Sequence, residues 1–95
     1  MIFIDIDGTL TDSPESGGKP LVDRIEKLKL LIHKGQEVVL WTGNGTAYAK
    51  KFAQDNGIVG AVCVSKPHIL VDDNPNIRPL GRIKVLDPAT FFGSI

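Results

Sequence analysis

The sequence predicts an α/β protein with a parallel sheet of about five strands and flanking helices. Short apolar runs rich in β-branched residues alternate with longer stretches in which apolar residues recur every three or four positions. That alternation is typical of parallel strands joined by helical crossovers. Polar clusters follow directly after several of the apolar runs, as expected where parallel strands end together at one edge of a sheet.

The first 35 residues predict one strand and one helix. Residues 2–4 are apolar and β-prone, which indicates a buried strand. Residues 13–20 are rich in Ser, Gly and Pro and predict a loop, whose Pro20 suits the first turn of a helix. The helix should end near residue 33, where a basic last turn precedes a glycine. Its apolar face would be formed by Leu21, Ile25, Leu28 and Ile32.

The rest of the chain predicts four more strands and two more helices. A helix is expected over residues 46–56, and its apolar face would hold Ala49, Phe52 and Ala53. A short helix is expected over residues 88–92. The strands are expected over residues 38–41, 61–64, 69–71 and 83–86, with a loop over residues 76–82.

Length and composition place these elements in a single domain, residues 1–95. Hydrophobic residues make up 42% and charged residues 23%, and the formal net charge is +0. Such a balance gives no support to strong nucleic-acid or membrane-surface binding. No apolar run approaches the ~18 residues of a transmembrane helix, and no signal peptide is recognisable. The single cysteine, Cys63, allows no internal disulfide, so we expect a cytoplasmic protein with no membrane partner.

Two carboxylates, Asp5 and Asp7, follow the first strand and precede a Gly8–Thr9 turn signal. Two unit charges ~4 Å apart repel by about 4 kcal/mol at an effective dielectric of 20. A shared proton, a cation or a basic side chain would offset that repulsion. A hard cation is the simplest candidate, because Mg²⁺ typically takes one or two carboxylates together with substrate phosphate. Taken alone, the pair could also be turn formers after an edge strand.

Three further polar clusters stand at predicted strand ends. Thr42–Gly43–Asn44 offers a hydroxyl and backbone donors leading into a helix, which suits phosphate oxygens or simply a helix cap. Lys66, after the third strand, offers a point charge or is a solvated loop lysine. Asp72–Asp73 offers metal ligands or a turn. Turn formation explains each cluster singly, but not why all of them offer phosphate or metal chemistry.

These motifs resemble the haloacid dehalogenase (HAD) superfamily of phosphatases, in its capless form. The resemblance runs from D-x-D-G-T at Asp5 to the aspartate pair at residue 73, and implies a Rossmann-like fold with Mg²⁺ as cofactor. It implies Asp5 as nucleophile and Asp7 as general acid and base. The implied catalytic residues are Asp5, Asp7 and Lys66, the phosphate-binding residues Thr42, Gly43, Asn44 and Lys66, and the metal ligands Asp5, Asp7, Asp72 and Asp73.

The implied function is a Mg²⁺-dependent phosphohydrolase acting through an aspartyl-phosphate. Between the aspartates of the last motif, Asp72 is the better candidate for direct ligation, because it comes first at the strand end. Two alternatives stay open: a receiver-like phospho-aspartate signalling module, and a non-catalytic binding protein that keeps the fold. Five residues could surround the mouth of the site, but packing or surface roles are favoured for them: Trp41, Asn44, Tyr48, His68 and Arg78.

The sequence departs from the family pattern in two places. Residues 13–20 and 58–65 are too short to insert a cap domain, so the rim should be open. That favours a phosphorylated substrate that is large or linked to a macromolecule, or an oligomer that covers the site. The link between the third and fourth strands is also short. In the family these strands lie on opposite sides of the first two, which requires a span of about 19 Å. Residues 64–69 reach about 18 Å at most. Either the third strand is short or displaced, or the fourth begins late.

Overall fold

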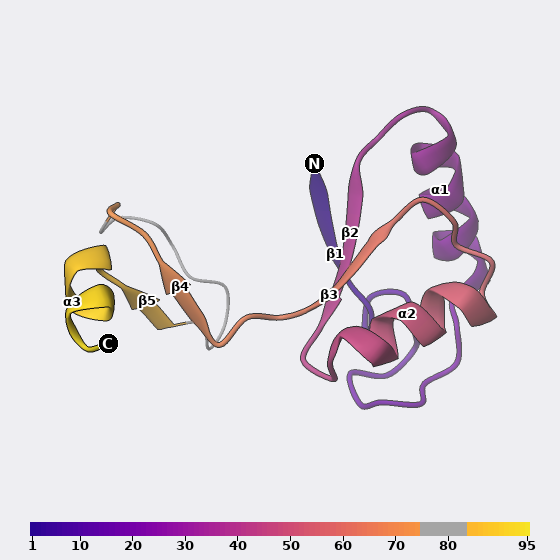
Figure 1. Cartoon of the computed structure of the whole chain (residues 1–95). Coiled ribbons are helices and arrows are strands. Elements are labelled where there is room, and N and C mark those ends of the chain that lie inside the picture. The colour runs from indigo at the N-terminus through magenta and orange to yellow at the C-terminus, as the bar shows by residue number, and fades with distance from the viewer. Residues whose placement is uncertain (75–83) are drawn as a thin grey trace.

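The computed structural model describes residues 1–74 and 84–95 and places five strands and three helices in them (Figure 1). In chain order these are β1 (Ile2–Asp5), α1 (Val22–His33), β2 (Val38–Thr42), α2 (Thr46–Asp55), β3 (Val62–Ser65), β4 (Ile69–Val71), β5 (Lys84–Leu86) and α3 (Pro88–Gly93). The predicted elements are all present, with boundaries that differ by one or two residues. The predicted loop over residues 76–82, Arg78 within it, and the predicted first residue of the last strand, Ile83, lie outside the described residues.

The strands are all paired in parallel, but they form two sheets instead of one. The first sheet has the order β1-β2-β3, with Ile4 beside Leu40 and Leu40 beside Cys63. The second consists of β4 and β5. The short link at residues 66–68 explains the division, because a parallel crossover needs about a dozen residues or more. The α/β class and its parallel strands are therefore confirmed, whereas the expected single sheet is divided.

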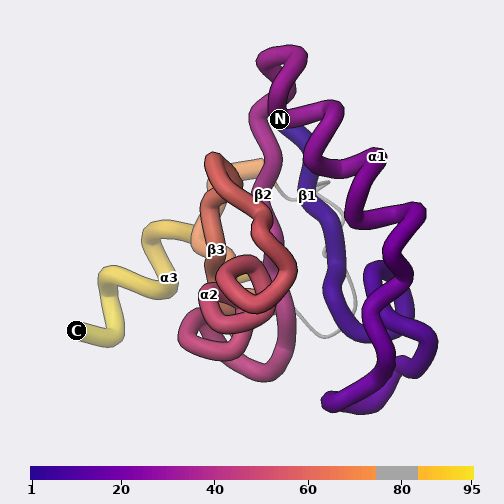
Figure 2. Tube along the Cα trace, turned by 90° about the vertical axis from the view of Figure 1, so that its right-hand side faces the viewer, coloured from indigo at the N-terminus to yellow at the C-terminus, as the bar shows by residue number. Residues whose placement is uncertain are grey.

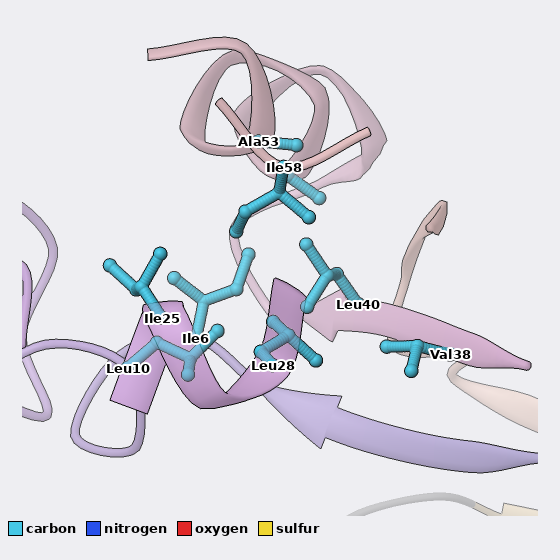
Figure 3. Close-up of a cluster of buried hydrophobic side chains, with 9 residues drawn as sticks. Ile6, Leu10, Ile25, Leu28, Val38, Leu40, Ala53 and Ile58 are labelled. Carbon is cyan, nitrogen blue, oxygen red and sulfur yellow. The ribbon is translucent and has the colours of Figure 1, made fainter. Parts of the chain in front are cut away.

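Both long helices cover the same side of the three-stranded sheet (Figures 1 and 2). Each buries the face that its sequence periodicity predicts, with Ile25 and Leu28 on α1 and Ala49 and Ala53 on α2. Figure 3 shows these helices meeting the sheet in one cluster of buried side chains. That cluster consists of Ile6, Leu10, Ile25, Leu28, Val38, Leu40, Ala49, Ala53 and Ile58.

The opposite side of the three-stranded sheet carries apolar side chains that remain exposed. Because side chains alternate along a strand, the register places Phe3, Trp41 and Val62 on this side. Phe3 is 49% exposed and Val62 is 56% exposed, and the Phe3 and Trp41 rings meet edge to face with centroids 4.9 Å apart. We call this side the open face. Within the described residues, the parallel sheet is thus covered by helices on one side only.

Beyond β3 the chain runs through residues 66–68 to a separate C-terminal unit, made of β4, β5 and α3 (Figure 1). Its strands pair only with one another among the described residues. No helix in residues 1–74 or 84–95 is long and apolar enough to span a bilayer.

Candidate active site

Asp5 is the last residue of β1 and makes an ion pair with a lysine from the end of another strand. Its Oδ1 lies 3.1 Å from the Nζ of Lys66, and its Oδ2 accepts a hydrogen bond of 3.2 Å from the hydroxyl of Thr9. The side chains of Asp5 and Lys66 are 32% and 39% exposed, so water screens the pair and a ligand can reach it. The pair is therefore a weak contributor to stability, typically 0–1 kcal/mol, and its position matters more for chemistry.

The turn after Asp5 aims the second carboxylate at the neighbouring strand. Ile6 between the two aspartates is fully buried, and its carbonyl accepts hydrogen bonds from the amides of Thr9 and Leu10 at 3.1 and 2.8 Å. Gly8 has a φ of +81°, and a Cβ there would lie 3.2 Å from the Cα of Pro14. A residue with a side chain would be strained at this point, so the glycine is needed to return the chain beside the site.

Asp7 accepts three hydrogen bonds, from the last side chain of β2 and from two side chains in the loop and helix that follow it. Its Oδ1 accepts 2.6 Å from the Tyr48 hydroxyl, and its Oδ2 accepts 2.7 Å from the Asn44 amide. The hydroxyl of Thr42 also donates to Oδ2, at 3.4 Å. These three donors fix the orientation of the Asp7 carboxyl group.

Thr42 ends β2 and fixes the start of the following loop. It is only 1% exposed, and its hydroxyl oxygen accepts a hydrogen bond of 3.1 Å from the Asn44 backbone N–H. The residue that caps α2 is Gly45, which has no side-chain capping bond, so Thr42 is not the helix cap. Gly43, between Thr42 and Asn44, is exposed, and a Cβ added there would have no neighbour within 4 Å. The end of β2 and this loop therefore place the Thr42 hydroxyl and the Asn44 side-chain amide beside Asp7.

Lys66 reaches the site because β3 runs alongside β2 to its end. The Lys66 backbone N–H donates to the Thr42 carbonyl at 2.8 Å, which continues the parallel pairing one residue beyond β3. Its Nζ lies 5.7 Å from the centroid of the Trp41 ring, within the range of a cation–π contact. Lys66 thus stands beside Asp5 as the sequence predicts, and the short link that follows it does not displace it.

The repulsion predicted between the two carboxylates is offset by different partners for each. Lys66 supplies the basic side chain for Asp5, whereas neutral donors surround Asp7.

The remaining predicted site residues, Asp72 and Asp73, lie in the C-terminal unit and away from this cluster. Asp72 follows β4, its N–H donates to the Leu86 carbonyl at 3.0 Å, and its Oδ1 accepts from the Asn74 N–H at 2.8 Å. Within residues 1–74 and 84–95, no three His, Cys, Asp or Glu side chains are grouped closely enough to hold a metal ion. One chain thus brings Asp5, Asp7, Thr42, Asn44 and Lys66 together, without Asp72 and Asp73.

Two residues contact the carboxylates in ways that the sequence analysis did not predict: Tyr48 was placed only at the mouth, with a packing or surface role favoured, and Thr9 only in a turn. Tyr48 lies in the first turn of α2, and the pKa of its hydroxyl is raised by the hydrogen bond to Asp7, by burial and by the Asp7 charge. The N–H of Gly17, which donates to the same oxygen, opposes this shift. The signal that could have found Tyr48 is its position in the helix that begins at the strand-end loop, where long side chains can reach back to the sheet edge.

A hollow of about 350 Å³ lies between the loop after β1 and α2, and Tyr48 lines it. The other lining residues are Thr11, Gly17, Gly18, Pro20, Lys51, Phe52, Asp55 and Asn56. Its volume is within the range of small-ligand sites, and Tyr48 is shared between the hollow and Asp7. Neither Asp5 nor Asp7 lines the hollow, and Tyr48 is the lining residue that connects it to Asp7.

Comparison with known families identifies the class of protein that this fold and site belong to. The family model described as haloacid dehalogenase-like hydrolase matches residues 2–69. Searches of curated proteins and of solved structures give no match. Because the family match spans more than half of the chain, the protein belongs to the haloacid dehalogenase-like hydrolases. The matched span includes Asp5, Asp7, Thr42 and Lys66, and it ends at the first residue of β4.

Proposed function

We propose that this hydrolase is a Mg²⁺-dependent phosphatase that forms an aspartyl-phosphate on Asp5. The observation that carries the proposal is the contrast between two neighbouring carboxylates. Asp5 is partly exposed and ion-paired to Lys66 at 3.1 Å, as suits a nucleophile that must meet an anionic phosphoryl group. Asp7 is held by three donors, as suits a group that moves protons in a fixed place.

In the first step, a carboxylate oxygen of Asp5 attacks phosphorus and the ester bond to the leaving group breaks. The leaving oxygen takes a proton from Asp7, which enters this step protonated. Lys66 neutralises phosphoryl charge as it accumulates, and the Thr42 hydroxyl with the Gly43–Asn44 backbone donates to the phosphoryl oxygens. Without substrate, Lys66 already lies beside Asp5 and the Thr42 hydroxyl already lies beside Asp7.

In the second step, Asp7 removes a proton from water, and that water attacks the phosphorus of the aspartyl-phosphate. The acyl-phosphate bond breaks, inorganic phosphate leaves, and Asp5 and Asp7 return to their starting states. The hydrogen bonds on Asp7 support this half of the cycle, because they stabilise its carboxylate and fix its orientation.

The oxygen-rich donor set at the end of β1 fits a hard cation such as Mg²⁺. Asp5, the Asp7 carbonyl and Asp72 would hold it, with Asp73 nearby, and Asp72 would have to come from outside the cluster described above. When bound, Mg²⁺ supplies charge neutralisation between the carboxylates and the phosphoryl group.

The exposure of the site favours a large or macromolecule-linked phosphate ester, because such a substrate would shield the reaction from water itself. The hollow beside Tyr48 would take the part of the substrate nearest the phosphate. Specificity constants for a small aryl phosphate and for phosphorylated polymers test this point. A strong preference for small metabolites would count against a large substrate.

Trapping the intermediate tests the proposed reaction. Rapid denaturation after mixing with a phosphate ester and Mg²⁺ should leave a phosphorylated chain that is stable in acid and cleaved by hydroxylamine. Peptide mapping should place the phosphate on Asp5, and Asp5→Asn should carry none. Failure to trap it, together with no phosphate release from sugar phosphates, nucleotides or phosphorylated macromolecules, would reject the proposal.

A further inference from the structure

The outer edge of β1 has no partner strand among the described residues. β1 pairs with β2 on one edge, and it stands at the end of the order β1-β2-β3. The strand is apolar, and Ile2 and Phe3 are 40% and 49% exposed. An apolar, unprotected strand edge is a template for pairing with another strand.

The open face gives the same sheet a second uncovered surface. Phe3, Trp41 and Val62 lie there, while α1 and α2 both cover the other side (Figure 1). Parallel sheets are normally covered on both faces. The edge and the face that lack cover are continuous, because Phe3 belongs to both.

The C-terminal unit also has exposed apolar side chains and an unpaired strand edge among the described residues. A sheet of two strands is marginally stable alone in water. Ile69 of β4 and Phe92 of α3 are 49% and 66% exposed, and α3 buries none of its residues. The edge of β4 away from β5 also lacks a partner among the described residues.

The linker prevents these two surfaces from meeting within one chain in parallel register. β3 ends at Ser65 and β4 begins at Ile69, a separation of four residues that reaches about 14 Å. Crossing from β3 past β2 and β1 to the free edge, and returning to its starting end, requires roughly 19 Å. Figure 1 shows the chain after β3 running away from the sheet instead.

We propose that the protein forms a reciprocal dimer in which the C-terminal unit of each copy docks on the other. β4 of one copy would pair in parallel with the free edge of β1 in the second copy, extending the sheet to β3-β2-β1-β4-β5. The aromatic side chains of α3 would then come to the open face. This is an exchange of identical elements between two copies, which a short connecting loop favours.

The exchange would also complete the active site. Parallel pairing puts the carboxyl ends of all strands at one edge, so Asp72 and Asp73 of one copy would stand beside Asp5 and Asp7 of the other. This part rests on the proposed phosphatase function, whereas the dimer itself does not. The acidic set that no single chain assembles among its described residues would then be assembled by two.

The mass in solution and the linker length test the exchange without reference to activity. Light scattering of the full chain should give twice 10.3 kDa. Inserting about eight Gly and Ser residues between Pro67 and His68 should let β4 reach its own β1 and give a monomer. The matched control places the same insertion between Gly35 and Gln36, in the exposed turn before β2, and should remain a dimer. A monomeric parent chain, or a dimer that the linker insertion leaves intact, would overturn the exchange.

Mixing two inactive variants tests the shared site. Asp5→Asn and Asp72→Asn chains, unfolded together and refolded, should form mixed dimers in which one of the two sites has both aspartates. Random pairing would restore roughly a quarter of the parent activity. The control mixes Asp5→Asn with Lys66→Ala, which should restore nothing, because Asp5 and Lys66 act within one chain.

The two proposals can fail separately. If the parent chain has no phosphatase activity but its mass doubles and the linker insertion halves it, the dimer stands and the function is rejected. If the parent is an active phosphatase but the Asp5→Asn and Asp72→Asn mixture stays inactive, the shared site is rejected.

Discussion

Both parts of this molecule contain parallel strands and helical structure, yet among the described residues only the first part has a buried core. Of the residues that the structure describes, the buried hydrophobic ones all lie in residues 6–58, between the end of β1 and the start of β3. In the C-terminal unit, β4, β5 and α3 contain no fully buried residue. The difference arises from the connections, because long crossovers place α1 and α2 on the first sheet, whereas the link of residues 66–68 leaves the second sheet without a neighbour.

The chemistry is divided along the same line. The nucleophile candidate, the proton-transfer candidate and the groups for phosphate are held in the three-stranded part by contacts between strand ends. The acidic residues that would complete a cation site are in the C-terminal unit. Each part therefore contains exposed apolar surface that the other part could cover. The candidate cation site would be complete only if the two parts came together, in the same copy or in two copies.

The largest effect is expected from Asp5→Asn in the three-stranded part. An amide cannot form the acyl-phosphate, so kcat should fall by at least about 10³-fold while the melting temperature stays close to that of the parent. The matched control is Asp23→Asn, an exposed carboxylate in the first turn of α1, which should leave kcat within about twofold. Phosphate release from an aryl phosphate is the measurement. Near-parental turnover by the Asp5→Asn protein would remove the nucleophile role from Asp5.

Removal of divalent cations should act nearly as strongly, and it would show that the two parts work together. Exhaustive chelation should abolish phosphate release, Mg²⁺ should restore it, and Ca²⁺ should restore little, because Ca²⁺ prefers more ligands and a looser geometry. Mg²⁺ should also raise the melting temperature of the parent chain, since binding to the native state stabilises it. That rise should be smaller in Asp72→Asn. Full activity after chelation would contradict a cation-dependent mechanism.

The sequence predicted what local patterns and nearest neighbours determine. The apolar spacing predicted the buried faces of α1 and α2, and the strand-end rule brought Asp5, Asp7, Thr42 and Lys66 to one edge. The one sequence feature that pointed to two sheets was the limited length that residues 64–69 can span. No local pattern encodes which strands become neighbours. Tyr48 was expected at most near the mouth of the site, and its hydrogen bond to Asp7 was not predicted, because that contact depends on how α2 meets the loop after β1, which periodicity does not describe.

Truncating an apolar side chain should lower the free energy of unfolding more in the three-stranded part than in the C-terminal unit. Leu40 on β2 is fully buried, so Leu40→Ala should lower the free energy of unfolding by about 3 kcal/mol through lost transfer energy and a cavity. Leu70 on β4 is only half-buried, so Leu70→Ala should cost about 1 kcal/mol or less in dilute solution. Urea denaturation gives both values. Equal costs at every protein concentration would show that β4 lies in a core as complete as that of β2.

The smallest effect is expected from Tyr48→Phe, which removes one of the three donors to Asp7 and leaves the carboxylates and Lys66 in place. Asp7 would be less firmly oriented, so kcat should fall roughly tenfold with little change in KM. The lost hydrogen bond should cost about 1 kcal/mol of stability at neutral pH.

The hydrogen bond that Tyr48→Phe removes should make the stability of the parent chain depend on pH. The pKa of Tyr48 is raised in the folded state, first by its hydrogen bond to Asp7, so the folded protein holds the phenol proton more tightly than the unfolded chain. The stabilisation is therefore fully present below about pH 10, the ordinary pKa of tyrosine, and is lost as the pH rises through the folded pKa.

Tyr48 is the chain's single tyrosine, so the absorbance of its ionised phenol reports this group alone. We expect its midpoint above that of the urea-unfolded chain, and the stability advantage over Tyr48→Phe should vanish over the same pH interval. Equal midpoints in the folded and unfolded chains would show that Tyr48 does not donate to Asp7 in solution.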